Sequence, residues 1–406
     1  MKKFLSILLI LIILFSLCGC EKINLDDLYS AFMGEMYPSL YETQEIVEVI
    51  YEEYEVRNPQ FSNCYNSLNS KQKEIYSRIN AVSEEMTEGF INLGENYTDG
   101  IKDTAIAYKA FLNDNTEIFW MPSGYIMGTS KKRGKEFLAI AFEYSDSKNN
   151  NSYLLSKAQR DTARKELDKA CEKIINKVKK LKSEYEKEKY INDFLCSKIT
   201  YTETGELIHT SYGAIVNGKA LCEGYSRAFK LLCNKAGIEC ELIVGEAENV
   251  GHMWNRVNID KKLSYVDVTW NDRTDYKTYT YFNITEEQLL KDHIISPLFS
   301  KLKSEDSARK DTFNFTYKKC SFSGNSFYEK NGRILWQDYT KTASKTINEI
   351  YSGSEGYAEF LFATENIQNM FSKNPQAFIQ EIQYHLNMAV LTGYIEERDT
   401  LLLFFE

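Results

Sequence analysis

Hydrophobic and polar positions follow their clearest pattern in the middle of the chain, where a helix is predicted directly after a cysteine. Beyond Cys222, apolar residues recur at helical spacing as far as Ala236, and Gly237 then ends the run in the manner of a helix C-cap. Cys222 is therefore expected in the first turn of an amphipathic helix with one buried face.

Three runs rich in β-branched and aromatic residues follow this helix and predict strands, at residues 239–245, 252–259 and 263–270. A two-residue turn at 260–261 would join the last two strands as antiparallel neighbours and set His252 opposite Thr269. Asp267 would then lie one same-face step from that position, within diagonal reach of the histidine. A turn longer by one residue would flip the faces.

The flanking segments carry weaker patterns. On the N-terminal side they predict helices at 71–85 and 103–112, strands at 118–120 and 136–144, a polar linker at 148–152, and one or two long helices within 159–199. On the C-terminal side, Asn331-Gly332 predicts a type I′ hairpin between residues 326–330 and 333–336. This segment also predicts a strand at 357–363, a helix at 375–390 and a closing strand at 400–405.

The first twenty residues are typical of a targeting segment. Lys2 and Lys3 precede an apolar run at 4–17, and small residues then lead to Cys20. This ending resembles a bacterial lipobox, in which cleavage before Cys20 leaves its thiol to be lipidated. An uncleaved membrane anchor is the alternative, because the run is nearly long enough to span a bilayer. Both interpretations place the protein outside the cytoplasm on a membrane surface.

Composition and charge narrow the class of function. The 406 residues are 43% hydrophobic and 26% charged, as in folded globular proteins, and a net charge of −9 argues against a dedicated nucleic-acid binder. Six cysteines lie outside the targeting segment and position 222, and they contain no CxxC pair. A zinc site is therefore not expected, whereas the sequence leaves open whether one or two disulfides form.

Cys222, His252 and Asp267 form a candidate catalytic set. At the start of a helix, free backbone N–H groups and the positive end of the helix dipole favour a thiolate, and the same groups could hold the oxyanion of a tetrahedral intermediate. His252 would take the thiol proton, and Asp267 would orient the imidazole. Gly218 and Gly224, on either side of the cysteine, would let a substrate backbone come close.

Three motifs in this order resemble the transglutaminase-like superfamily, a branch of the papain-like Cys-His-Asp folds found in many bacterial surface proteins. They are residues 217–229 (Asn-Gly-Lys-Ala-Leu-Cys-Glu-Gly-Tyr-Ser-Arg-Ala-Phe), 251–255 (Gly-His-Met-Trp-Asn) and 265–270 (Tyr-Val-Asp-Val-Thr-Trp). The pair Asp292-His293 also fits the family pattern, and the resemblance covers roughly residues 184–293. It implies that Cys222 is the nucleophile, His252 the general base and acid, and Asp267 the orienting acid.

The resemblance implies an α+β fold, in which a helix bearing the cysteine packs on an antiparallel sheet bearing the histidine and the aspartate. The expected organisation is a lipoprotein signal peptide at 1–20, a mainly helical N-terminal accessory domain at 21–150, the transglutaminase-like core at 155–297 and a small α+β domain at 298–406. The C-terminal segment shows no catalytic set of its own.

One departure from the family concerns the oxyanion. Eukaryotic transglutaminases resemble this core but use an upstream tryptophan to help bind the oxyanion, and here no tryptophan lies between Trp120 and Trp254. Tyr212 is the candidate substitute. Gly224 and Trp254 are further oxyanion or substrate candidates, with core packing as the alternative role of Trp254. The departure leaves both water and an amine open as the acyl acceptor.

We therefore expect a lipid-anchored surface protein that acts on amide bonds through a thioester, without a metal or organic cofactor. Hydrolysis of peptides or cell-wall peptides is the first expectation, and protein cross-linking by transglutamination is the second. A non-catalytic surface binding module on the same fold is the alternative from a different class. His209, His293 and His385 are scattered without metal-ligand spacing, so we interpret them as structural or exposed.

Overall fold

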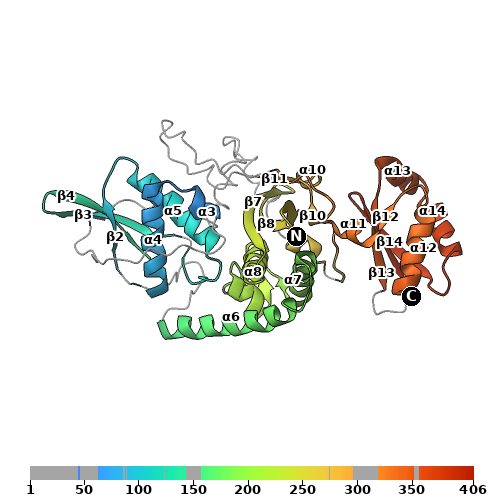
Figure 1. The fold of residues 1–406 in the computed structure, drawn as a ribbon, viewed down its shortest axis with the longest axis horizontal. Coiled ribbons are helices and arrows are strands. Elements are labelled where there is room, and N and C mark those ends of the chain that lie inside the picture. Colours follow the sequence, from blue (N-terminus) through green and yellow to red (C-terminus); the bar gives the residue numbers. More distant parts are fainter. Residues whose placement is uncertain are drawn as a thin grey trace, which may run out of the picture.

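The structure, a computed structural model, describes residues 44–45, 63–142 except 86, 88 and 123, 157–295 except 274, 319–351 and 356–406. Three larger sheets, each accompanied by helices, follow one another along the chain and lie in a row along its long axis (Figure 1). The predicted α+β class is confirmed. The expected signal peptide and the linker at 148–152 lie outside the described residues. No helix within the described ranges is both long and apolar enough to cross a membrane.

The described residues of the N-terminal part form a four-stranded sheet and three helices. The sheet has the order β1-β3-β4-β2, in which β1 runs parallel to β3 and the other neighbours are antiparallel. The elements are β1 (Gln44–Glu45), α3 (Asn63–Ser67), α4 (Ser70–Glu85), β2 (Ile91–Glu95), α5 (Gly100–Asp114), β3 (Ile126–Lys132) and β4 (Lys135–Ala141).

The sequence predicted α4, α5 and β4, but the strand expected at 118–120 is wrong. These residues lie in a turn, and their side chains fill the core. The Trp120 indole N–H donates to the Ser83 carbonyl at 3.1 Å. A short apolar run is therefore explained by burial alone, because periodicity over three residues cannot separate a strand from a buried turn.

The central part is an antiparallel sheet of order β10-β9-β8-β7-β11, on which the helix α8 packs. Its elements are α6 (Lys157–Val178), α7 (Glu184–Lys198), β5 (Thr200–Tyr201), the π-helix η1 (Gly213–Asn217), β6 (Lys219–Ala220), α8 (Cys222–Lys235), β7 (Glu239–Ala247), β8 (Val250–Ile259), β9 (Lys262–Val266), α9 (Val268–Asn271), β10 (Phe282–Ile284), α10 (Glu286–Leu289) and β11 (His293–Ile295).

The predicted turn at 260–261 is confirmed, since both residues have positive φ and Ile259 pairs with Lys262. The third predicted strand is wrong beyond Val266, so the expected pairing of His252 with Thr269 does not form. Asp267 instead caps the short helix α9, and its carboxylate accepts the backbone N–H of Trp270. An aspartate that satisfies a free N–H in this way favours a helix start over a continued strand.

The C-terminal part has a sheet of order β12-β13-β15-β14, with β12 parallel to β13 and the other neighbours antiparallel. Its elements are α11 (Phe327–Asn331), β12 (Ile334–Leu335), α12 (Tyr339–Ile350), β13 (Tyr357–Phe362), α13 (Glu365–Lys373), α14 (Pro375–Tyr384), β14 (Leu391–Glu397) and β15 (Thr400–Phe405). The strands predicted at 357–363 and 400–405 are confirmed, and the helix predicted from 375 ends earlier than expected.

The hairpin predicted at Asn331-Gly332 is wrong. Asn331 is the last residue of α11, and Gly332 is its C-cap with a left-handed backbone at φ 62°. The positive φ that a type I′ turn would have used therefore ends a helix instead. The chain then enters β12, which pairs with β13 rather than with a neighbouring hairpin strand.

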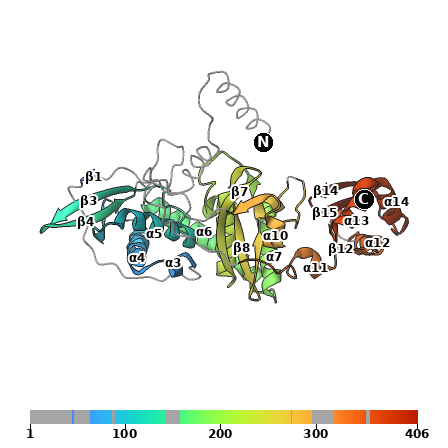
Figure 2. The same cartoon turned by 90° about the horizontal axis from the view of Figure 1, so that it is seen from above.

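One continuous hydrophobic cluster extends from the N-terminal part into the central part, and a separate cluster fills the C-terminal part. The helix α6 contacts α7 and α8 along one side of the central part (Figure 1), and the view from above shows the same row of three parts (Figure 2). Lys230 of α8 donates to the Asn113 carbonyl at 2.8 Å, so the N-terminal part braces the helix that begins with Cys222. The seven cysteines among the described residues are free thiols.

Candidate active site

The Cys222 thiol occupies the first position of α8. The N-cap residue, Leu221, has an extended backbone and an apolar side chain, so it offers no side-chain oxygen to the free N–H groups of the first turn. Cys222 is 6% exposed, and the helix behind it is buried over most of its length. The Cys222 thiol therefore lies at the positive end of the helix dipole, at the edge of the apolar core. The sequence predicted this position at the start of the helix.

Two side chains tie α8 to the strand that carries His252. The Ser226 hydroxyl donates to the Met253 carbonyl at 2.8 Å, and the Asn255 amide donates to the Ser226 carbonyl at 3.0 Å. Both contacts are buried, and they involve the first and third residues after His252 along β8. The register between helix and strand is therefore fixed by specific hydrogen bonds in addition to apolar packing.

His252 links the thiol to a buried carboxylate. Its Nε2 lies 2.6 Å from the Asp267 Oδ2, and because an ionised carboxylate only accepts, Nε2 carries the proton. Nδ1 is then the nitrogen left to take a proton from Cys222, whose side chain is near enough to affect the pKa of the ring. Burial alone would lower the pKa of His252, but Asp267 and then Cys222 outweigh it and raise the pKa to about 10.

Asp267 is surrounded by donors. Its Oδ2 accepts from His252 and also lies 3.2 Å from the Nε2 of His293, while its Oδ1 accepts the Trp270 N–H at 3.1 Å. Its own backbone N–H donates to the Tyr281 carbonyl at 2.9 Å. Burial favours the neutral acid, yet the interactions with His252 and then His293 hold the pKa of Asp267 well below its usual range.

His293 is the site residue that the sequence reasoning missed. It begins β11, its side chain is fully buried, and its Nδ1 lies 2.6 Å from the Asp292 Oδ1. Both ring nitrogens thus face carboxylates, which accept and cannot donate, so the ring is doubly protonated. Burial lowers the pKa of His293, but hydrogen bonds to Asp267 and Asp292 raise it overall. The available signal was the Asp292-His293 pair at the end of the family resemblance.

The aromatic residues around His252 have different exposure. Trp254 is fully buried, with its ring centroid 5.9 Å from that of His252 and 4.9 Å from that of His293. Trp254 therefore packs in the core, which was the alternative role stated for it. A direct contact with substrate is wrong, because the side chain has no exposed surface. Trp270 is half-buried at 5.7 Å from His252 and belongs to the rim of the site.

Gly224 allows the segment at Ile208 to pack against the first turn of α8. A Cβ at this position would lie 2.3 Å from the Ile208 carbonyl oxygen, which also accepts the Leu221 N–H at 3.0 Å. The segment before η1 therefore lies directly against the start of α8, and only glycine fits there. The close backbone approach predicted for Gly224 exists, but its partner is Ile208.

Two tyrosines, Tyr212 and Tyr201, differ in whether their hydroxyl groups could donate to an oxyanion. The Tyr212 hydroxyl donates to the Glu166 carboxylate of α6 at 2.6 Å, and its ring stacks on Phe119 at 4.8 Å, so its hydroxyl is already engaged. Tyr201, in β5, is 49% exposed. Burial first, and then the charge of Cys222, raise the pKa of Tyr201, so its hydroxyl stays protonated and can donate a hydrogen bond.

His252, Asp267 and His293 are also the group of described residues whose ligand atoms could hold a metal ion, since those atoms lie within 4.8 Å of one another. The same atoms are joined by hydrogen bonds of 2.6 and 3.2 Å. A cation would have to displace the protons that now lie between them. We assign no metal to the mechanism.

A cysteine at the start of a buried helix, with a His–Asp pair beside an antiparallel sheet, is the arrangement of a papain-like fold. Residues 172–270 match the family model of the Transglutaminase-like superfamily, so the middle of this chain is similar to that superfamily. Among curated proteins, no match to this chain was found.

Three solved structures are similar to parts of the chain. One described as a TGase is 18% identical with a TM-score of 0.26, and the match covers 41% of this chain and 48% of that one. A candidate protease from Parabacteroides distasonis is 12% identical (TM-score 0.21; 35% and 39% covered). A candidate cysteine protease from Cytophaga hutchinsonii is 12% identical (TM-score 0.25; 47% and 70% covered). The chain thus spans about half the length of the first of these structures.

Proposed function

We propose that the protein is a thiol enzyme acting on amide bonds, with Cys222 as nucleophile, His252 as general base and acid, and Asp267 as the orienting acid. The observation that carries the proposal is the buried hydrogen bond between Asp267 and His252, together with a thiol at the start of α8 that acts on the pKa of the same histidine. Packing alone does not require a thiol, an imidazole and a carboxylate to meet in this order.

The reaction follows from the tautomer of His252. Nδ1 of His252 first takes the proton of the Cys222 thiol, and the thiolate of the resulting ion pair attacks the carbonyl carbon, which gives a tetrahedral oxyanion. The C–N bond then breaks, His252 returns the proton to the departing amine, and a thioester remains on Cys222. Water, deprotonated by His252, attacks the thioester and releases a carboxylic acid and the free thiol. An amine in place of water would give a new amide.

The oxyanion is expected to face the first turn of α8. The N–H groups there are the backbone donors nearest to Cys222, and the half-exposed Tyr201 hydroxyl is the side-chain donor that replaces the missing tryptophan. Tyr201→Phe keeps the ring and removes this donor. Turnover should fall roughly 10²–10³-fold without a comparable change in KM. A change in KM alone would instead assign Tyr201 to substrate binding.

Hydrolysis of peptides or cell-wall peptides is the reaction we propose first. Full-length protein in detergent would be incubated with glutamine-containing peptides and with cell-wall peptides in ¹⁸O-labelled water, with and without a labelled primary amine. Mass spectrometry would then detect ¹⁸O in a new carboxylate or the amine in a new amide, and Cys222→Ser and His252→Ala should abolish either product. Amine incorporation would favour cross-linking. Peptide binding without product in the wild type would favour a binding module.

We propose that the protein is held outside the cytoplasm by a lipid on Cys20, because a basic start, an apolar run and small residues precede that cysteine. Metabolic labelling with a fatty acid should mark the wild type and leave Cys20→Ala unlabelled. Labelling of neither protein, with both retained in the membrane fraction, would instead favour the uncleaved anchor.

A further inference from the structure

The turn between β14 and β15 carries an arginine where the backbone favours glycine. Arg398 has φ 58°, and its neighbours Glu397 and Thr400 pair across the turn. An arginine in this left-handed region is less favourable than a glycine, and such outliers concentrate at functional positions. The Arg398 side chain is 10% exposed and reaches from the C-terminal part into the central part.

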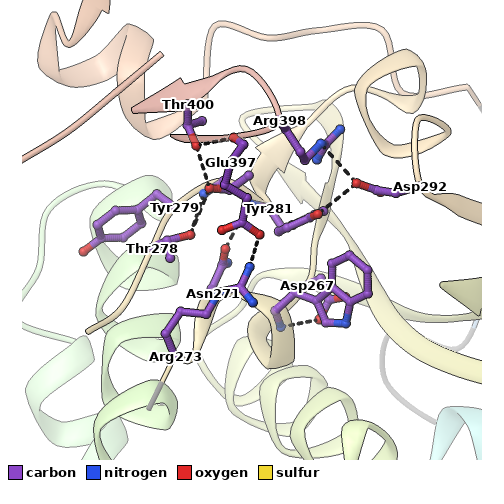
Figure 3. A network of polar contacts seen from close by, with 12 residues as sticks. Asp267, Asn271, Arg273, Thr278, Tyr279, Tyr281, Asp292, Glu397, Arg398 and Thr400 are labelled. Carbon is purple, nitrogen blue, oxygen red and sulfur yellow. Dashed lines mark hydrogen bonds and ion pairs between the residues drawn. The ribbon is translucent and has the colours of Figure 1, made fainter. Parts of the chain in front are cut away.

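Arg398 meets an acidic residue that contacts the active site. Its Nε lies 3.1 Å from the Asp292 Oδ2, and its guanidinium lies over the Tyr281 ring, 4.7 Å from the centroid. The Tyr281 hydroxyl donates to the same Asp292 oxygen at 2.9 Å (Figure 3). The other Asp292 oxygen, Oδ1, contacts the Nδ1 of His293. Positive and negative groups thus alternate from Arg398 through Asp292 and His293 to Asp267.

The C-terminal part is seated on the central part by contacts that do not involve Arg398. Buried Glu359 accepts the Tyr279 N–H at 2.8 Å and the Thr280 hydroxyl at 3.0 Å, and Arg273 forms an ion pair with Glu397 (Figure 3). Lys291 pairs with Asp399 at 3.0 Å, one residue along the chain from both Asp292 and Arg398. Removing the Arg398 side chain therefore leaves several docking contacts intact.

We propose that Arg398 is a positioning residue for the active site: it holds Asp292 against His293, and His293 in turn holds the Asp267 carboxylate toward His252. The inference rests on the proposed function, because it assigns a role at the same Cys222–His252–Asp267 site. It also gives the C-terminal part a task, since the site receives one of its supports from the β14–β15 turn.

The physical consequence is a pH dependence. The charged and titratable groups around His293 are Asp267, His252, Asp292 and, beyond Asp292, Arg398 and the Tyr281 hydroxyl. Without Arg398, the Asp292 side chain, already 21% exposed, can turn to solvent, and His293 loses the acceptor at Nδ1. If His293 becomes neutral, the site loses a positive charge. The ring centroid of His293 lies 5.7 Å from that of His252. Loss of a nearby positive charge raises the pH needed to form a thiolate at Cys222.

The test uses full-length protein in detergent and the rate of Cys222 alkylation by iodoacetamide, followed by mass spectrometry across pH. Arg398→Gln and Asp292→Asn should move the pH of half-maximal rate upward by about one unit and slow labelling at neutral pH roughly tenfold. Arg398→Lys should retain most of the wild-type profile. Asp399→Asn, which breaks the neighbouring Lys291 ion pair, is the matched control and should behave like the wild type.

An identical profile for Arg398→Gln, Asp399→Asn and the wild type would overturn the inference, provided that wild-type Cys222 labels faster than the other cysteines. If wild-type Cys222 is not activated, the proposed function fails, and ¹⁵N NMR of the His293 ring then decides the inference separately. The ring should be doubly protonated in the wild type and singly protonated in Arg398→Gln; no difference would contradict the inference. Should Arg398→Gln unfold, Asp292→Asn supplies the same two readouts.

Discussion

Replacing Asp267 by asparagine perturbs the centre of the site with almost no change in shape. The carboxylate accepts three hydrogen bonds, from His252 and His293 on Oδ2 and from the Trp270 N–H on Oδ1. An asparagine offers one oxygen and one NH₂ group. Whichever way the amide is turned, its NH₂ must face at least one of these donors. Asp267→Asn therefore cannot reproduce the wild-type contacts.

The magnitude depends on which end faces the histidines. With the oxygen toward them, the cap of α9 is lost, which costs about 1 kcal/mol of stability. With the NH₂ toward them, the buried cationic His293 loses a charged partner, which costs about 3–5 kcal/mol. In either case the charge that raises the pKa of His252 to about 10 disappears, and burial then lowers this pKa. The imidazolium that would stabilise a thiolate is lost, and turnover should fall about 10²–10⁴-fold.

The assay combines alkylation of Cys222 across pH with thermal unfolding of the same samples. Asp267→Asn should label slowly at neutral pH and recover only in alkali, where any thiol ionises. Asp275→Asn, at an exposed position in the same region, is the matched control and should behave like the wild type. Wild-type labelling by a folded Asp267→Asn protein, with an unchanged pH profile, would refute the assigned role of Asp267.

Three further predictions concern the supports of the site. Gly224→Ala should lower Tm and slow Cys222 labelling more than tenfold, because its Cβ would lie 2.3 Å from the Ile208 carbonyl oxygen. Ser226→Ala removes the hydrogen bond to Met253 and should cost about 1 kcal/mol in denaturant unfolding. Burial raises the pKa of Glu359 from 4.5 to about 7. Protonated Glu359 therefore contributes to the stability of the fold below pH 4.5, and this contribution is lost as the pH rises through 7. Glu359→Gln should therefore flatten the fall in Tm between about pH 5 and 8.

Each of these predictions has a result that contradicts it. An unchanged Tm for Gly224→Ala would mean that the segment at Ile208 moves away freely. Wild-type stability of Ser226→Ala would show that apolar packing alone sets the register between α8 and β8. An equally steep pH dependence in Glu359→Gln would move its cause to another buried acid, such as Glu188, whose pKa burial raises to about 8.

The sequence predicted the parts of the site that depend on local pattern. Helical spacing with a terminal glycine located α8 and placed Cys222 in its first turn, and the structure has it at the first position. The two-residue turn at 260–261 fixed the register of β8 against β9. Asp267 was expected near His252 as the diagonal neighbour on a paired strand, and the contact exists although Asp267 lies beyond that strand.

The remaining features depend on contacts between distant segments or on residues that serve two structures. Asn331-Gly332 supplies a positive φ that fits a helix end as well as a hairpin, and only the tertiary context decides between them. His293 and Arg398 reach the site from separate elements: the Asp292-His293 pair fitted the family pattern without indicating the contact with Asp267, and Arg398 carries no local signal at all. A lone histidine without metal-ligand spacing was for this reason interpreted as structural or exposed.

The most direct test of the central claim is the rate at which Cys222 is alkylated near neutral pH, measured beside His252→Ala. Cys196, half-buried and with its pKa raised well above the ordinary range chiefly by burial, serves as the internal comparison. Labelling of Cys222 should be rapid, should exceed that of Cys196, and should slow markedly in His252→Ala. Labelling no faster than at Cys196 and unchanged by His252→Ala would contradict an activated nucleophile and favour a binding protein on this fold.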